Sequence, residues 1–425
     1  MRNAIVSFSW LALLQLACGP NGSRPQGNHP GGGNKDMTVI DNGNGDGGYM
    51  PPPGCKSTGG DPNGDQDQDG YTPMQGDCDD CNPTINPGAI QIPGDPTDYA
   101  CNGMPGVRPT CDTMNVGKND ATSLAAAFEQ CDSRFFKSAT LVGPSDTKAR
   151  AVTPAFGSIK PQAGANMALL STGLAVDKNG AGFVEPQIGT SLGCSNEFAH
   201  PLPNIMPNPA CAASVGTMSC EPMMVKDYTE LVVKLHAPTN ANSFSFQFQF
   251  FSAEYPDFVC TIFNDEFLVL QESPMEFPQP TNISFDSNKN PITVNNGLFT
   301  VCQNGTMTYD MNCKQPVTML AGTGYEDPAS MSSKNPPPTC NDDYMSSCTQ
   351  NPLMPGGDTS GGNSVPIGGS TGWLTTTAPV TPGEDVTLHF IIFDEGDHIY
   401  DSAVTIDNFQ WGTTVIMTPS TGPIS

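Results

Sequence analysis

Basic residues are scarce in this chain of 425 residues. Lys and Arg total 17 against 43 Asp and Glu, which gives a formal net charge of -26 at pH 7. Such a charge argues against binding to nucleic acid, because the phosphates would be repelled. The simplest interpretation is a solvated acidic exterior, and calcium bound by clustered carboxylates is the alternative.

Charged residues of both signs make up only 14% of the chain, whereas Gly and Pro contribute 45 and 41 residues. Long amphipathic helices need Ala, Leu, Glu and Lys in quantity, so this composition favours turn-rich β structure with linkers. The chain has no transmembrane stretch beyond its amino-terminal leader, and there is no internal repeat. The length suggests two folded units plus non-globular tails.

The amino terminus has the pattern of an export signal. Met1-Arg2-Asn3 is a short basic start, residues 4–14 form an apolar run too short to span a membrane, and Cys18 follows a small residue. The pattern resembles a bacterial lipoprotein signal, which implies acylation of Cys18 and an outer-membrane or cell-surface location. Ordinary secretion stays open, because Gln15 replaces the usual aliphatic residue. Without Cys18, fourteen of the fifteen cysteines remain, an even number that can pair in an oxidising compartment.

Composition divides the chain into five segments. A tether with almost no aliphatic residues follows the signal, and it cannot bury enough surface to offset its ordering entropy. The predicted segments are a signal peptide at 1–17, a flexible, disordered tether at 18–54, a cysteine-rich acidic module at 55–115, a β domain at 119–412 and a tail at 413–425.

The period-two pattern of a strand is clearest at residues 243–251. Phenylalanines alternate there with Ser and Gln, which predicts one buried face and one exposed face. The alternating residues are Phe244, Phe246, Phe248 and Phe250. Aromatic and β-branched runs predict further strands at 231–235, 266–270, 386–393 and 403–411, and residues 121–128 predict a short helix.

The fold expected from these elements is mainly β, a jelly-roll-like sandwich with long loops. Residues 302–370 are rich in Pro, Gly, Ser and Asn and have little core of their own, so disulfides are expected to staple them. Their cysteines are Cys302, Cys313, Cys340 and Cys348.

The acidic module contains the sequence Asp65-Gln-Asp67-Gln-Asp69-Gly70. Carboxylates at alternate positions let a loop curl around one hard cation, and glycine allows the sharp turn. The loop is not an EF-hand, because position twelve is Gly76 where a bidentate Glu is required. Further carboxylates follow closely, so the predicted ligands are Asp65, Asp67, Asp69, Asp77, Asp79 and Asp80.

Residues 65–103, with Asn86-Pro-Gly-Ala89 and Cys101-Asn-Gly103, resemble the metal-binding motif of secreted bacterial proteins related to the copper-repressible surface protein MopE. The resemblance implies a metal site. Copper prefers imidazole, thioether or thiolate ligands, whereas carboxylate oxygens suit calcium, and the segment has no His. Calcium is therefore the predicted ion and copper the less favoured one, and an acidic turn without an ion remains the alternative.

Cys78-Asp-Asp-Cys81 has the spacing of a redox or zinc motif. No second motif of this kind and no suitable His follow it, and no βαβ pattern surrounds it. Structural disulfides of undetermined connectivity are the preferred interpretation.

Acidic residues gather again at the ends of the predicted strands. Neighbouring carboxylates repel one another unless an ion or hydrogen-bond donors neutralise them, which predicts a second calcium site. Its predicted ligands are Glu254, Asp265, Asp394, Asp397, Asp401 and Asp407. The alternative is that these side chains cap turns by accepting from backbone amides.

Several short motifs in the β domain occur in the order of a known family. They include Phe251-Ser-Ala-Glu-Tyr255, Phe263-Asn-Asp265-Glu-Phe267, Gly372-Trp-Leu-Thr375 and Ile406-Asp-Asn-Phe409. Over about 119–412 the chain resembles the choice-of-anchor L domain, a bacterial surface module found with varied anchors. We expect a lipid-anchored, calcium-binding surface protein that makes adhesive or structural contacts, with carbohydrate or another surface protein as its partner.

The rival hypothesis is a secreted polysaccharide-active enzyme, since two carboxylates flanking a glycosidic bond can hydrolyse it. No residue pair stands out as acid and nucleophile, so we predict no catalytic residues. Gly189-Thr-Ser-Leu-Gly193 matches a serine-hydrolase pattern only by letter. Tyr255, Trp373 and Tyr400 are candidates for a sugar-binding platform, and core or rim packing is the more common role of such aromatics.

Overall fold

The computed structural model describes residues 55–56, 60–108, 111, 118–143, 147–187, 189–190, 192, 200–202, 225–255, 264–294, 298–302, 314–326, 368–395 and 399–424. The predicted signal peptide and tether with Cys18, the predicted ligand Asp397, and Cys313, Cys340 and Cys348 lie outside these residues.

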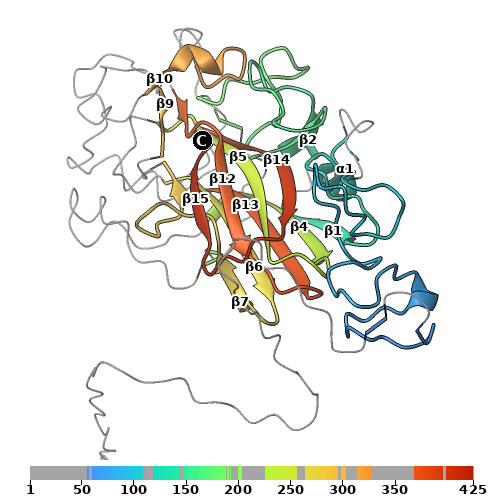
Figure 1. Cartoon of the computed structure of the whole chain (residues 1–425). Coiled ribbons are helices and arrows are strands. Elements are labelled where there is room, and N and C mark those ends of the chain that lie inside the picture. Colours follow the sequence, from blue (N-terminus) through green and yellow to red (C-terminus); the bar gives the residue numbers. More distant parts are fainter. Residues whose placement is uncertain are drawn as a thin grey trace, which may run out of the picture. The chain divides into compact units, whose positions relative to one another are not determined.

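The described strands form two sheets (Figure 1). The first contains, in spatial order, β1 (Phe136–Val142), β4 (Val225–His236), β13 (Asp385–Glu395), β6 (Glu266–Ser273) and β7 (Phe277–Asn282), with β8 (Ile292–Thr293) beside β6. The second contains β10 (Gln315–Pro316), β9 (Val301–Cys302), β11 (Gly369–Ser370), β5 (Ser243–Ser252), β14 (Ser402–Gly412), β3 (Met167–Ser171) and β2 (Arg150–Thr153), and β12 (Leu374–Pro379) pairs with both β5 and β15 (Ser420–Pro423).

Helical structure is sparse in the described residues. It consists of α1 (Ala121–Ala126) and the 3-10 turns η1 (Pro73–Gln75), η2 (Thr147–Ala149) and η3 (Val317–Leu320). Asp120 caps α1, because its side chain accepts from the backbone amide of Ser123 at 2.9 Å. No described helix is long and apolar enough to cross a membrane.

The mainly β fold predicted from the sequence is confirmed. All five predicted strands are present, as β4, β5, β6, β13 and β14, and the predicted helix is present as α1. The strands that were not predicted include β1, β3 and β12. Each of them is short, and each lacks the clear alternation of apolar and polar residues that marks β5.

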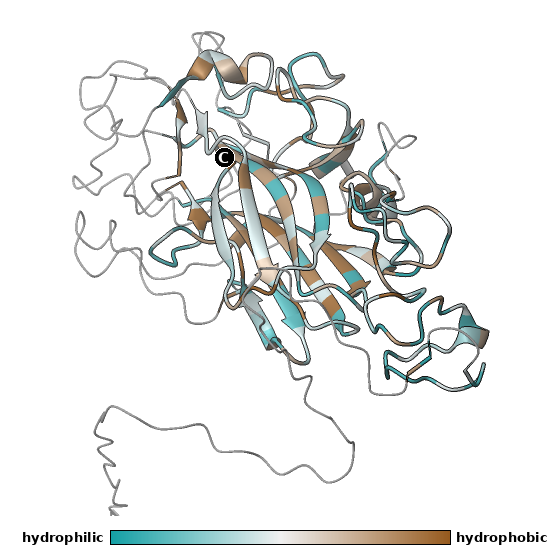
Figure 2. Ribbon diagram, viewed as in Figure 1, coloured by the Kyte–Doolittle hydropathy of each residue, from teal (hydrophilic) through white to brown (hydrophobic). Residues whose placement is uncertain are grey.

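The two sheets face each other across one aromatic core. The ring of Phe246 in β5 lies 5.3 Å from that of Phe390 in β13, and Phe248 lies 4.9 Å from Phe267 in β6. Figure 2 shows the alternating hydrophobic and hydrophilic bands along these strands. Successive strands from β4 to β6 and from β12 to β14 alternate between the sheets, which gives the sandwich its jelly-roll-like connections.

The prediction that β5 has one exposed face is wrong for its second half. Ser245 and Gln247 are only partly buried, as predicted, but from Phe248 onward every residue of β5 is buried. A second apolar cluster covers the outer face there, where Phe251 contacts Phe156 and Tyr325 at centroid distances of 5.3 and 5.6 Å. Residues distant in sequence supply this cover, so the local pattern could not reveal it.

The cysteine-rich module packs against the turn between β4 and β5. The amide of Thr239 donates to the carbonyl of Gly88 at 3.1 Å. The side chain of Asn240 accepts from the amide of Ile90 at 2.9 Å and donates to its carbonyl at 3.1 Å. Ile90 itself lies in the core of the sandwich. Gly88 permits this approach, because a Cβ there would lie 2.9 Å from Cγ2 of Thr239.

Candidate functional site

The aspartates of the acidic loop are first of all turn-forming residues. Asp65 accepts from the amides of Gln68 at 2.6 Å and Gly70 at 3.1 Å, and Asp69 accepts from Tyr71 at 2.8 Å. Gly70 has a φ of 94°, a conformation that favours glycine. These bonds curl the loop as predicted. They engage both carboxylate oxygens of Asp65 but only one of Asp69.

Two overlapping groups of carboxylates converge inside this loop. One carboxylate oxygen each from Asp67, Asp69 and Asp77 lie within 4.8 Å of one another, and the same holds for Asp65, Asp67 and Asp80. Asp67, Asp69 and Asp77 each keep one buried side-chain oxygen without a hydrogen-bond partner. A hard cation is the ligand that such converging oxygens suit.

The negative charges of these carboxylates repel one another. Burial and the neighbouring charge of Asp69 raise the pKa of Asp67 to about 7. Burial and the charge of Asp77 likewise raise the pKa of Asp69 to about 6, and burial raises the pKa of Asp77. Among the described residues, no ion pair involves a carboxylate of the module. A bound cation would remove this repulsion.

The remaining predicted ligands of the module have different positions. Asp80 is buried and accepts from the amide and the side chain of Gln66 at 3.0 and 2.5 Å, yet it belongs to one converging group. Asp79 belongs to neither group, and its carbonyl accepts from the amides of Cys81 and Asn82. The sequence spacing alone did not distinguish these two residues.

Disulfides close the module around its carboxylates. Cys55 pairs with Cys81, Cys78 with Cys101, and Cys111 with Cys131. Cys78 and Cys81 therefore bond to different partners, which confirms structural disulfides over a redox or zinc motif. Thiolates are thus unavailable to a metal here, and the ligands present are oxygens.

A second acidic cluster lies at one end of the sandwich. It contains the predicted residues Asp265, Asp394 and Asp401 together with Asp227, which the sequence analysis missed; their exposed fractions are 0, 1, 3 and 0%. Glu254 adjoins it, because its carboxylate accepts from the amide of Asp265 at 3.3 Å. Burial and the charges of the other three raise the pKa of Asp394 well above its ordinary value.

Asp227 joins the cluster because of sheet topology. Strand β4 lies beside β13, and a β-bulge opposite the end of β13 places Asp227 near Asp394, with a φ of 47° at Asp227. The sequence signal was an isolated acidic residue before a predicted strand, which is common in proteins. Only the pairing of the strands identifies it.

Asp407 does not join this cluster, which corrects the predicted ligand set. Its carboxylate accepts from the backbone amides of Gln162 and Ala163, the latter at 3.1 Å. It lies six positions after Asp401 along extended β14, or about 20 Å at the usual rise per residue. The alternative interpretation, a carboxylate that accepts from backbone amides, is the correct one for Asp407.

The three aromatics considered as a sugar platform do not form one. Tyr255 is buried and stacks on Phe299 at a centroid distance of 4.5 Å. Trp373 and Tyr400 are partly buried and pack against the cluster that covers β5. Core and rim packing is therefore their role. In the serine-hydrolase pattern, Ser191 lies outside the described residues.

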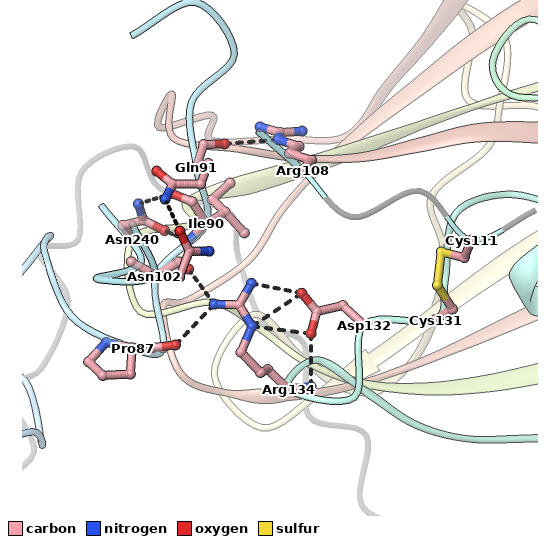
Figure 3. A network of polar contacts seen from close by, with 12 residues as sticks. Pro87, Ile90, Gln91, Asn102, Arg108, Cys111, Cys131, Asp132, Arg134 and Asn240 are labelled. Atoms are coloured by element: carbon pink, nitrogen blue, oxygen red, sulfur yellow. Dashed lines mark hydrogen bonds and ion pairs between the residues drawn. A yellow bond between two sulfur atoms is a disulfide. The ribbon is translucent and has the colours of Figure 1, made fainter. Parts of the chain in front are cut away.

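A cavity of about 260 Å³ opens where the module meets the sandwich. Figure 3 shows its polar wall, where Arg134 reaches Asp132 at 2.7 Å and the carbonyl of Pro87 at 3.0 Å, and Arg108 donates to the carbonyl of Gln91 at 2.9 Å. Aromatic rings complete the lining, among them Phe135, Phe409 and Trp411. Local sequence patterns do not reveal this cavity, because its lining comes from segments more than 300 residues apart, as the 303-residue separation of Arg108 and Trp411 shows.

Comparison with known proteins gives one match. Residues 224–410 match the choice-of-anchor L domain, whereas no curated protein and no solved structure matches the chain. The match begins at β4 and not near residue 119, although β1, β2 and β3 complete the same two sheets. The family is a domain of cell-surface proteins and is not known as an enzyme family. The sequence motifs and the strands from β4 to β14 agree with this match of residues 224–410 to the choice-of-anchor L domain.

Proposed function

We propose that this protein is a calcium-binding protein of the cell surface that makes adhesive or structural contacts. The observation that supports calcium binding is the convergence of Asp67, Asp69 and Asp77, each with a buried oxygen that has no hydrogen-bond partner. Metal binding in this module is part of a structural role, because it neutralises carboxylates that otherwise repel one another.

Calcium fits these ligands better than copper or zinc. The converging ligands are carboxylate oxygens, the described cysteines of the module form disulfides, and the module contains no His. Calcium accepts six to eight oxygens in flexible geometry, and backbone carbonyls or water can complete the set. Copper and zinc would select nitrogen or sulfur ligands.

An ion in the module would also stabilise its contact with the sandwich. The side chain of Asn86 lies beside Asp69, and its amide oxygen accepts from the hydroxyl of Thr239 at 2.7 Å. Asn86 therefore connects the acidic loop to the turn between β4 and β5. Order imposed on the loop is transmitted to the surface where the module docks.

Thermal unfolding in calcium and in chelator tests the proposal. Calcium is expected to raise Tm of the wild type, since a ligand at about 100 times its Kd adds about 2.7 kcal/mol. Asp77→Asn should lose the part of this gain that the module contributes. Asp61→Asn is the matched control, because Asp61 is exposed and belongs to neither converging group. Its carboxylate accepts from the nearby amide of Asn63. An unchanged calcium response in Asp77→Asn would contradict the calcium site of the module.

The proposed partner is carbohydrate, and the junction cavity supports this choice. Its size suits one sugar ring, and its wall combines aromatic rings with amide and guanidinium groups that can hydrogen-bond hydroxyls. A glycan screen with purified protein tests it. Gln410→Ala, at an exposed lining residue, should weaken binding, whereas Gln279→Ala, exposed on β7, should not. Binding only to another surface protein would contradict this choice.

The rival function, a polysaccharide-active enzyme that uses rim carboxylates, has less support. The carboxylates in question are buried, with Asp394 1% and Asp265 0% exposed, so a polymer cannot reach them. Turnover in the same glycan screen would decide for the enzyme.

Attachment through a lipid on Cys18 belongs to the same proposal. Its support is the signal-like pattern before Cys18 and the surface location of the family. Mass spectrometry of the mature amino terminus tests it, and a terminus at another residue without acylation would contradict it.

A further inference from the structure

The core of the sandwich ends in a layer of carboxylates. On β13, Phe390 and Ile392 face the core, and the period of two places Asp394 on the same side. Asp265 precedes β6 in phase with the core residue Phe267. The first sheet thus directs acidic side chains into the space between the sheets. Asp401, which directly precedes β14 of the second sheet, lies near enough for its charge to act on Asp394.

Hydrogen bonds account for part of this layer. Asp227 accepts from the amide of Leu192 at 2.8 Å, and Asp401 accepts from the amide of Thr190 at 2.8 Å. Asp265 accepts from the hydroxyl of Ser402. Each of these three carboxylates therefore has at least one donor in the surrounding protein.

Asp394 differs from the other three. It is 1% exposed, and neither of its carboxylate oxygens has a hydrogen-bond partner. The nearby hydroxyl of Thr172 is already engaged, because it accepts from the amide of Ser402 at 2.9 Å and donates to its carbonyl at 3.4 Å. Asp394 thus directs two unpartnered oxygens into a group of three other carboxylates.

No described cationic side chain forms an ion pair with Asp394 or Asp401. Lys226 is the register partner of Asp394 on β4 and is itself buried. A buried carboxylate without a partner is strongly unfavourable, and four neighbouring carboxylates increase the penalty through mutual repulsion. A divalent cation would satisfy the free oxygens and the excess charge together.

We propose that Asp394, Asp227, Asp265 and Asp401 form a second calcium site, which joins the two sheets at this end of the sandwich. Carboxylates and the hydroxyl of Ser402 are its described donors, a hard all-oxygen set. Three ligands come from the first sheet and one from the second, so the ion is a cross-link between the sheets. This site is separate from the acidic module and does not depend on calcium binding there.

The site is more open than the module. Among the described residues, no three carboxylates of this cluster have oxygens that all lie within 4.8 Å, whereas the module has two such groups. Calcium binding therefore draws the strand ends together. Asp401 is packed tightly against the loop after β3, because a Cβ added at Gly173 would lie 1.8 Å from its Oδ2.

Calcium stoichiometry of the full-length protein tests the site. Calorimetric titration with calcium should show one fewer equivalent in Asp394→Asn than in the wild type. Asp77→Asn should lose only the binding of the module, and the double variant should lose both. If Asp394→Asn binds as many ions as the wild type, with an unchanged calcium-induced rise in Tm, the second site does not exist. The Asp77→Asn result separately decides the calcium site of the module.

Folding of Asp394→Asn is expected, because Asn has the same shape and removes one repelling charge. Its Tm in chelator should exceed that of the wild type. A second readout does not depend on this variant. Tyr325 is buried where the charges of Asp401, Asp394 and Asp265 act on it, so terbium in the site should emit when tyrosine is excited. In the Asp77→Asn background, which removes the module site, Tyr325→Phe should reduce that emission and Tyr71→Phe should not; equal emission with and without Tyr325→Phe in that background would overturn the site.

Discussion

Aspartate has two distinct roles at the scale of single residues in this chain. Asp407 has backbone amides for partners, whereas Asp394 has two buried oxygens with none. Asp394 lies near the end of β13 and Asp407 in the middle of β14, both among apolar neighbours, and their local sequences do not separate their roles. What differs is the presence of a loop that supplies donors, here residues 162–163.

Replacing Asp407 tests the first role. Asp407→Ala leaves the amides of Gln162 and Ala163 without their acceptor, and the expected loss is about 1–3 kcal/mol of unfolding free energy. The loss should be equal in calcium and in chelator, because Asp407 belongs to neither proposed site. Denaturant titrations in the two buffers measure it, and a loss seen only in calcium would assign a ligand role to Asp407.

The pair of His200 and Glu266 predicts a dependence of stability on pH. Burial alone would lower the pKa of His200, but the hydrogen bond and charge of Glu266 and the charge of Glu395 outweigh it and raise the pKa. The distance between His200 Nε2 and Glu266 Oε2 is 3.4 Å. A histidine whose folded pKa is raised contributes stability that is complete below its unfolded pKa of about 6.5 and is lost as pH rises through the folded value.

His200→Gln should therefore be less stable than the wild type at pH 6, and the difference should shrink as pH rises toward 9. Unfolding free energies at several pH values in saturating calcium measure the effect. A difference that grows with pH would show that the pair is not stabilised by the histidine charge.

At the scale of elements, strand ends determine which functional groups meet. The loop after β3 passes so close to Asp401 that only glycine fits at position 173, because a Cβ would lie 1.8 Å from Asp401 Oδ2. The two segments are also joined by the amide of Thr172, which donates to the carbonyl of Ser402 at 3.0 Å. The close approach places Asp401 at the end of the sandwich.

Gly173→Ala should consequently destabilise the protein and displace Asp401. Overpacking of this kind costs about 1–3 kcal/mol. Gly422→Ala on β15 is the matched control, since nothing lies within 4 Å of its added Cβ. Denaturant unfolding measures both variants, and a Gly173→Ala protein as stable as the control would show that the loop adjusts without strain.

At the scale of the whole described chain, the module and the sandwich share an interface of specific hydrogen bonds. Asn240 makes two of them, with both backbone groups of Ile90, and Arg134 donates to the carbonyls of Pro87 and Ala89 at 3.0 and 3.1 Å. The sandwich therefore holds the segment that follows the acidic loop. Calcium in the module and docking of the module should stabilise each other.

Asn240→Ala tests this coupling. Loss of its two buried hydrogen bonds should cost about 1–3 kcal/mol and make residues 60–108 more sensitive to protease. Asn288→Ala, at an exposed turn, is the control. Limited proteolysis followed by mass spectrometry locates the cleavage. Equal protection of the module in both variants would contradict a contribution of this contact to docking.

The sequence by itself determined the mainly β class, the five principal strands and the acidic loop of the module. These features depend on neighbours within a few residues: the alternation of Phe with Ser and Gln in β5, and the spacing of Asp65, Asp67 and Asp69 before Gly70. Side-chain period and turn geometry are local properties, so they are legible without the fold.

Only the tertiary structure decided which distant groups meet. It brought Asp227 to Asp394 because β4 and β13 are neighbours in one sheet, and it directed Asp407 to a different loop. It also buried the second half of β5 on both faces and formed the cavity beside Arg108. Such contacts depend on strand order and on loops more than 100 residues away, and the free energy that selects them comes from burial shared by the whole sandwich.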